Sequence, residues 1–306
     1  MGLRYLIGRI AVMVPVFLIV VTVVFAMIRF APGGPFDTER QIPPDIMKNL
    51  NAKYHLDEPL WKQYFRYLND LAHFDLGPSF KHSNRTVNEI IGDSLPVSAE
   101  LGLISLVWAL LIGITAGGLA ALKPNTWSDY VPMSISILGI CLPTFVIGPL
   151  LILVFGLWLR VLPVAGWNSW QDRILPSLTL GFAYAAYISR LMRGGLMEIR
   201  SQDYIRTARA KGLSEPKILV KHALRGGILP VVSFLGPALA GIITGALVTE
   251  TIFNIPGLGR FFIESALNRD YTVVMGTALL YFTLIFVCNF LVDILYVFLD
   301  PRVKYE

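Results

Sequence analysis

The sequence has little charge for its length. Only 15% of its 306 residues are Asp, Glu, Lys or Arg, whereas 55% are hydrophobic. A typical soluble domain carries about 25% charged residues, so these apolar side chains exceed what an ordinary globular interior holds, which excludes a soluble enzyme of one or two domains. The 18 Phe, 12 Tyr and 6 Trp residues also exclude a disordered chain, because they supply more burial than a solvated chain needs.

Residues that bind metals or form disulfides are scarce. The two cysteines, Cys141 and Cys288, both fall within apolar runs, where a cysteine usually packs as a small hydrophobic residue. The four histidines do not have the spacing of a metal-binding motif such as His-Glu-x-x-His. We therefore expect no metal site and no cofactor bound by this chain.

Motifs for ATP hydrolysis are absent as well. A nucleotide-binding loop needs a Gly-rich turn followed by Lys and Ser or Thr, and no Gly-Lys dipeptide occurs in the sequence. The Gly-rich stretches at 33–35 and 257–260 lack this spacing and are more typical of turns. Neither a Gly-x-Ser-x-Gly motif nor a pair of intramembrane carboxylates placed as acid and base is present. We expect the chain not to be an enzyme.

Long apolar runs are what the sequence has instead. A helix that crosses a bilayer needs about 20 mostly apolar residues. Six segments meet this length or come close to it, and we count each as a span: 10–28, 101–122, 131–159, 174–189, 228–249 and 271–299. The sequence therefore predicts an all-α membrane protein with six transmembrane helices. Prolines within the runs, and Gly-x-x-x-Gly spacing at 113–117 and 241–245, are typical of bent, closely packed helices.

The positions of Lys and Arg indicate how the chain is oriented. Cytoplasmic loops carry an excess of these residues, and the densest cluster lies between 193 and 225. We therefore expect both termini in the cytoplasm. These loops account for the net charge of +5, so we expect no nucleic-acid partner.

The predicted spans divide the chain into three parts. A tail with the first helix spans 1–30, an external segment spans 31–100, and a five-helix core spans 101–306. Apolar residues at helical spacing from 56 to 71 predict a small amphipathic helix in the external segment.

Four ionisable residues lie near or within the predicted spans. Glu100 and Glu250 are expected at outer ends as interfacial carboxylates, and Arg190 as a cytoplasmic anchor. Asp293 lies about two turns inside the end of the last span, so it needs a partner on a neighbouring helix. No second buried acid or histidine accompanies it, which makes a proton-coupled carrier the weaker hypothesis.

The longest cytoplasmic stretch, 193–227, carries the most informative pattern. Good helix formers precede Gly212, a natural C-terminal stop, so a short helix should lie along the membrane surface. A second helical stretch should follow at 216–224. On charge alone, a helix with Arg206, Arg209 and Lys211 would be expected to bind anionic lipid headgroups.

This stretch resembles the cytoplasmic coupling loop of ABC-importer permeases, and the dipeptide and oligopeptide branch most closely. The residues that carry the resemblance are Tyr204, Ile205, Arg206, Thr207, Ala208, Arg209, Ala210, Lys211, Gly212 and Leu213, followed by 221–225 and 228–230. The Glu-Ala-Ala opening of the broader family is replaced by Arg-Thr-Ala at 206–208, while its glycine is kept at 212. The usual Ile-x-Leu-Pro closing is not matched at 222–225, a departure that fits the peptide branch.

Further stretches extend the resemblance over most of the chain. They lie at 29–35, 75–80, 250–259, 266–271 and 300–302. Together they resemble the B-type permease subunit of an oligopeptide importer. The resemblance implies a type I permease fold whose last five helices form the shared core. It also implies that 204–213 couples the chain to an ATPase, with Ala208 and Gly212 central and Arg206 and Arg209 facing the ATPase cleft.

The resemblance also implies a set of partners in the bacterial inner membrane. They are a second related permease, two cytoplasmic ATPases that bind ATP and Mg, and a periplasmic or lipid-anchored peptide-binding protein. Three alternatives stay open: a permease for dipeptides or nickel, a secondary carrier that works without ATP, and a membrane scaffold or assembly subunit.

Overall fold

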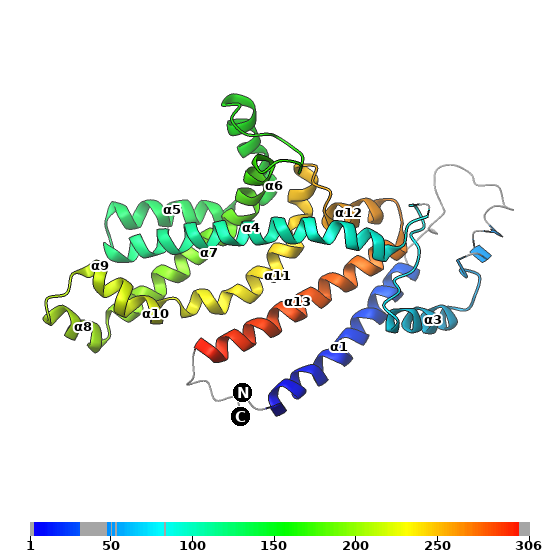
Figure 1. The fold of residues 1–306 in the computed structure, drawn as a ribbon, viewed down its shortest axis with the longest axis horizontal. Helices are drawn as coiled ribbons and strands as arrows, with labels where there is room; N and C mark the ends of the chain where they lie inside the picture. Colours follow the sequence, from blue (N-terminus) through cyan, green and yellow to red (C-terminus); the bar gives the residue numbers. More distant parts are fainter. Residues whose placement is uncertain (1–2, 31–47, 50, 53, 83, 300–306) are drawn as a thin grey trace. The chain divides into compact units, whose positions relative to one another are not determined.

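The described part of the chain is mainly helical. The computed structural model describes residues 3–30, 48–49, 51–52, 54–82 and 84–299, and Figure 1 shows its helices joined by loops. Within it, β-structure is limited to an isolated antiparallel bridge between Pro78 and Thr86. The predicted all-α class is confirmed. The stretch at 31–35, the side chain of Asp293 and the stretch at 300–302 lie outside the described residues.

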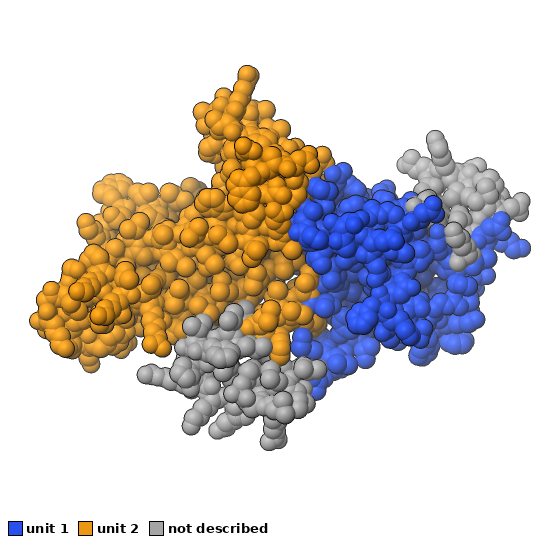
Figure 2. Space-filling model, in the orientation of Figure 1, with its two compact units in different colours: residues 1–97, 256–283 blue, residues 98–255, 284–306 orange. Residues whose placement is uncertain are grey.

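Two compact units make up the chain (Figure 2). Unit 1 comprises residues 1–97 and 256–283, and unit 2 comprises 98–255 and 284–306. The helices of unit 1 are α1 (Leu3–Phe30), α3 (Leu60–Ala72), the start of α4 (Val87–Leu122), α12 (Leu258–Leu267) and the start of α13 (Tyr271–Leu299). Unit 2 holds the rest of α4 and α13, with α5 (Trp127–Cys141), α6 (Thr144–Leu151), η1 (Ile152–Trp158), η2 (Gln171–Arg173), α7 (Ile174–Arg200), α8 (Asp203–Ala210), α9 (Glu215–Ile218), η3 (Leu219–Ala223), α10 (Leu224–Gly227) and α11 (Leu229–Ile252). The three-part division of the sequence stays a prediction.

Fewer helices than expected are long and apolar enough to cross a membrane. Among the described residues, three qualify alone: Ala11–Phe30, Val87–Leu122 and Tyr271–Leu291. The number rises to five if each of two bent pairs is one span, Trp127–Cys141 with Thr144–Trp158 and Glu215–Gly227 with Leu229–Ile243. The fourth predicted span corresponds to α7, which is not among them and continues past Arg190 to Arg200. The count of six stays a prediction.

The sharpest bend follows from a proline. The axes of α5 and the following helical stretch differ by 113°, and Pro143 stands immediately before α6. A residue that precedes proline is pushed out of the helical region, and Leu142 has extended backbone angles of φ −87° and ψ 124°. The bending expected from the prolines of this run is confirmed.

Two glycines let α4 and α7 pack closely. A Cβ added at Gly113 would lie 2.7 Å from the Cβ of Ile188, and one added at Gly117 would lie 2.4 Å from the carbonyl oxygen of Ser189. Paired small residues allow helix backbones to approach in this way. The close packing expected at 113–117 is confirmed, and its partner is α7.

The structure also places the amphipathic helix and the two cysteines. The amphipathic helix of the external segment is confirmed as α3, which begins at Leu60 after Pro59. Cys288 is buried, as expected for a packing residue, whereas Cys141 at the end of α5 is exposed.

We predict that Gly117→Ala lowers the free energy of unfolding by about 1–3 kcal/mol, because the new methyl group must push α4 and α7 apart. The matched control is Gly118→Ala, where an added Cβ meets nothing within 4 Å and helix propensity favours alanine. Denaturant unfolding in detergent measures both. Equal stability of the two variants would contradict the proposed close contact.

Candidate functional site

The candidate coupling segment is a run of short helices after α7. Helix α8 ends at Ala210, and Gly212 follows with a φ of +77°, a left-handed conformation that glycine adopts without strain. The amide of Gly212 donates to the carbonyl of Arg209 over 2.8 Å. The predicted glycine stop is confirmed, as is the helical stretch after it, which runs through α9, η3 and α10.

One side of α8 belongs to the core of unit 2. Ile205 is fully buried and Ala208 is nearly so. Both belong to the apolar cluster that includes Met192 and Leu196 of α7. Because i and i+3 positions share one face of a helix, the methyl group of Ala208 packs inside the chain as Ile205 does. The central role expected for Ala208 in coupling to an ATPase stays a prediction.

The other side of α8 is exposed. The exposed residues of the predicted coupling run are Tyr204, Arg206, Thr207, Ala210, Lys211 and Gly212, while Arg209 and Leu213 are half-buried. Arg206 pairs with Asp203 at 3.4 Å, and both side chains are largely exposed. This surface, which we call the α8 face, is open to a partner.

Glu215 joins the ends of four helices. Its Oε1 accepts from Nε of Arg209 at 2.6 Å, and its Oε2 accepts from Nη2 of Arg200 at 3.2 Å. Arg200 also donates to the carbonyls of Ala121 and Leu122 at the end of α4. The guanidinium of Arg209 thus has a partner within the chain and is 35% exposed. That Arg209 faces the cleft of an ATPase stays a prediction.

A second charged pair ties α5 to α7. Nε and Nη2 of Arg193 donate to the two carboxylate oxygens of Asp129 at 2.6 and 2.7 Å. This parallel fork is the strongest arginine–carboxylate geometry. Asp129 is only 2% exposed, so its charge depends on this partner. Sequence reasoning missed the pair, although an acid at the start of the third apolar run and an arginine after the fourth were a usable signal.

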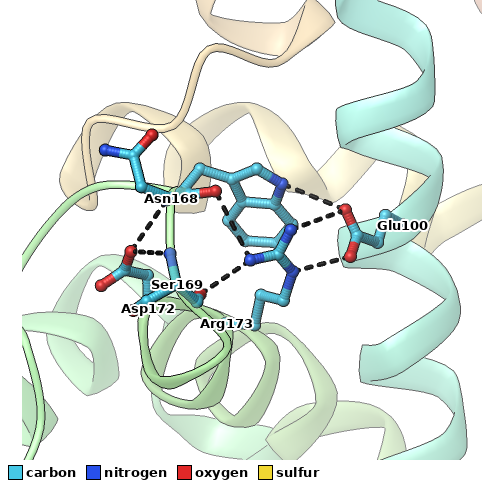
Figure 3. Close-up of polar contacts among 6 residues, drawn as sticks. Glu100, Asn168, Ser169, Asp172 and Arg173 are labelled. Atoms are coloured by element: carbon cyan, nitrogen blue, oxygen red, sulfur yellow. Dashed lines mark hydrogen bonds and ion pairs between the residues drawn. The ribbon is translucent and has the colours of Figure 1, made fainter.

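A third network lies at the other end of α7 (Figure 3). Nε of Arg173 donates to Glu100 of α4 at 2.6 Å, and its Nη1 donates to the carbonyl of Ser169 at 2.7 Å. Trp167 donates from Nε1 to the same carboxylate at 3.2 Å, and the guanidinium lies 4.7 Å from its ring centroid. Glu100 is partly exposed, as expected for an interfacial carboxylate, but its partner was not foreseen.

The loop before α7 is ordered by a carboxylate of its own. Asp172 accepts from the backbone amides of Ser169 and Asn168 at 2.7 and 2.8 Å (Figure 3). These donors, the Ser169 amide foremost, hold the pKa of Asp172 below its usual value. The carboxylate thus stays charged and keeps the loop folded next to Arg173.

Glu250 lies inside the chain. It is fully buried and accepts from the hydroxyl of Ser98 at 2.6 Å. Its expected position at an outer membrane interface stays a prediction. Among the described residues, no group of three or more His, Cys, Asp or Glu could hold a metal ion.

The proteins that this chain resembles are named as components of transport systems. The family model described as "Binding-protein-dependent transport system inner membrane component" matches residues 113–305. The chain is 47% identical over 305 residues to the oligopeptide transport system permease protein OppB of Haemophilus influenzae, covering 99% of this chain and 100% of that protein. It is 44% identical over 301 residues to the dipeptide transport system permease protein DppB of Bacillus subtilis, covering 98% of each.

Solved structures show the same fold. An inward-facing structure of the MetNI methionine ABC transporter matches with a TM-score of 0.59 and 16% identity, covering 69% of this chain and 96% of that one. An amino acid ABC transporter with histidines matches with a TM-score of 0.53 and 17% identity, covering 68% and 94%.

We predict that Glu215→Gln lowers the free energy of unfolding by about 1 kcal/mol, because the neutral amide leaves Arg200 and Arg209 without a counter-charge. Trypsin should also cleave the segment 201–227 faster. The control is Asp203→Asn, since the exposed pair of Asp203 with Arg206 contributes little. If both variants behaved alike, Glu215 would not hold the helix ends together.

Proposed function

The chain belongs to the family of binding-protein-dependent transport system inner membrane components, and we propose that it forms half of a pathway through which oligopeptides enter the cell. It is a transmembrane subunit of an ABC importer and not itself an enzyme. The observation that carries the substrate class is the 47% identity, over the whole chain, to a permease named for oligopeptide transport.

A dipeptide is the second candidate substrate. The 44% identity to a dipeptide permease of Bacillus subtilis is close to the values for the oligopeptide permeases, so overall similarity separates the two substrates only weakly. The preference for oligopeptides rests on the 45–47% identities of several relatives with that name.

The proposed assembly follows from the family. A second related permease completes the pathway, two cytoplasmic ATPases bind ATP and Mg, and a periplasmic or lipid-anchored binding protein delivers the peptide. The cluster of Lys and Arg at 193–225 supports a cytoplasmic position for this segment and for both termini.

The proposed mechanism is alternating access. When the ATPases close, they push the α8 face. Ile205 and Ala208 pass this movement to α7 through the apolar core, and Glu215 passes it to the ends of α4 and α7. ATP binding then favours one of two packings of the permease pair, because the ATPases bind that packing more tightly.

Peptide uptake by the reconstituted transporter, made of both permeases, both ATPases and the binding protein, tests the substrate class and the energy source. We predict ATP-dependent accumulation of a labelled pentapeptide that requires this chain and that persists after the proton gradient is collapsed. Parallel assays use a labelled dipeptide and nickel. Preference for the dipeptide or nickel would reassign the substrate, and loss of uptake without the gradient would indicate a secondary carrier. Undiminished uptake without this chain would indicate a scaffold.

We predict that Arg206→Glu lowers ATP-driven uptake at least about tenfold while the amount of membrane-inserted protein stays unchanged. A reversed charge at the centre of a contact costs several kcal/mol. Lys217→Glu is the matched control, because Lys217 is exposed on α9 and lies outside the α8 face. The readouts are uptake and peptide-stimulated ATP hydrolysis. If Arg206→Glu transported normally, the α8 face would not be the coupling surface.

A further inference from the structure

A polar cavity in unit 1 has no role in the proposed coupling mechanism. It has a volume of about 180 Å³. Its wall includes Arg29 near the end of α1, Gln63, Arg66, Tyr67 and Asp70 of α3, Asp75 in the segment after α3, and Thr272 at the start of α13.

Several polar atoms of this wall have no hydrogen-bond partner within the described part of the chain. They are Nε of Arg29, Oε1 of Gln63, Nη1 of Arg66 and the hydroxyl of Tyr67, and all four are buried. The side chain of Gln63 is 93% buried, being only 7% exposed. A buried polar atom without a partner costs about 1–3 kcal/mol, so four such atoms around one cavity indicate a polar occupant.

The cavity lies at the ends of two helices that could cross a membrane. The apolar stretch of α1 ends at Phe30, one residue after Arg29, and that of α13 begins at Tyr271, one residue before Thr272. Both helices are membrane-span candidates of sufficient length. Because a span ends at the surface of the bilayer, we expect the cavity to lie at the depth of the lipid headgroups.

Helix α3 has the features of a helix that lies in this interface. Two contacts of Tyr64 hold α3 to α1. Its hydroxyl hydrogen-bonds to that of Thr22 at 2.6 Å, and the centroid of its ring lies 5.2 Å from that of the Phe25 ring. Trp61 and Phe65, one turn apart, are 65% and 62% exposed. Aromatic side chains are enriched at the headgroup level, and Gln63, Arg66 and Tyr67 occupy the side of α3 that lines the cavity.

We propose that this cavity holds the headgroup of a phospholipid, with its phosphate at Arg29, Arg66 and Tyr67 and a neighbouring ammonium group at Asp70 and Asp75. Arginine donors suit phosphate oxygens, and the two carboxylates suit an amine, which makes phosphatidylethanolamine the fitting lipid. Burial raises the pKa of Tyr67, so its hydroxyl remains a donor. The volume is below the roughly 300–1,000 Å³ of sites for larger ligands, so it suits a headgroup better than an oligopeptide.

Native mass spectrometry of the complete transporter tests the proposal. The transporter is equilibrated in nanodiscs of phosphatidylcholine with either phosphatidylethanolamine or phosphatidylglycerol, and the retained lipid is counted after release. Wild type should retain phosphatidylethanolamine preferentially. Tyr67→Phe should lower its retention about fivefold, the loss of one hydrogen bond, and Arg29→Gln about tenfold. Asp70→Asn should lower retention of phosphatidylethanolamine but not of phosphatidylglycerol.

Three controls separate lipid binding from folding. Tyr64→Phe removes a hydroxyl that hydrogen-bonds to Thr22, so it should lower the melting temperature and leave lipid retention unchanged. Tyr67→Phe in lipid-free detergent should melt no earlier than wild type, because its hydroxyl has no partner among the described residues. Arg85→Gln breaks a pair with Asp93 that does not line the cavity and should retain lipid like wild type.

Three results would overturn the proposal. Unchanged lipid retention by both Tyr67→Phe and Arg29→Gln would show that the cavity holds no headgroup. Displacement of the lipid by a soluble tripeptide would make the cavity a substrate site. Weaker binding of the peptide-binding protein to Arg29→Gln, with lipid retention intact, would assign the cavity to that protein.

Discussion

Arginines at both ends of α7 fix this helix to its neighbours in unit 2. Arg173 binds Glu100 near one end of the unit 2 part of α4, and Arg200 binds the carbonyls of Ala121 and Leu122 at the other end. At about 1.5 Å per residue, Glu100 and Ala121 are about 32 Å apart along α4, close to the thickness of the hydrocarbon layer. The charges can therefore reach the two membrane surfaces, while Gly113 and Gly117 pack against α7 between them.

This arrangement explains why movement at α8 would be transmitted rather than absorbed. Partly exposed ion pairs contribute little stability each, and the pairs of Glu215 are of this kind. These pairs instead fix the geometry of the segment, because the carboxylate of Glu215 holds both Arg200 and Arg209 in place. The Asp129–Arg193 pair differs, since loss of the arginine would leave a buried charge uncompensated. Such a pair resists separation of α5 from α7.

Local features were predictable from the sequence, and long-range pairings were not. Gly212, Pro143 and the amphipathic pattern of α3 act on the backbone within a few residues, so their outcomes followed from conformational preference. The partners of Glu250 and Arg173 lie far away in the sequence, so only tertiary packing sets them. Likewise, the fourth predicted span ends at 189, whereas α7 continues as the same helix to Arg200 and carries Arg193 in its basic second half. A count of apolar residues does not register a helix that extends beyond the membrane.

The two proposed sites have different relations to the family. The family model begins at residue 113, so it includes α7 and α8 but leaves out α1 and α3. The proposed coupling to an ATPase therefore involves a part of the chain that the family model matches. Of the residues that line the cavity in unit 1, only Thr272 lies within the matched range. A headgroup bound there would hold the first span, α3 and the start of α13 at one depth, because all three contribute to the cavity wall. The segment before the shared core would then set how unit 1 sits in the bilayer, a task separate from the response of α8 to ATP.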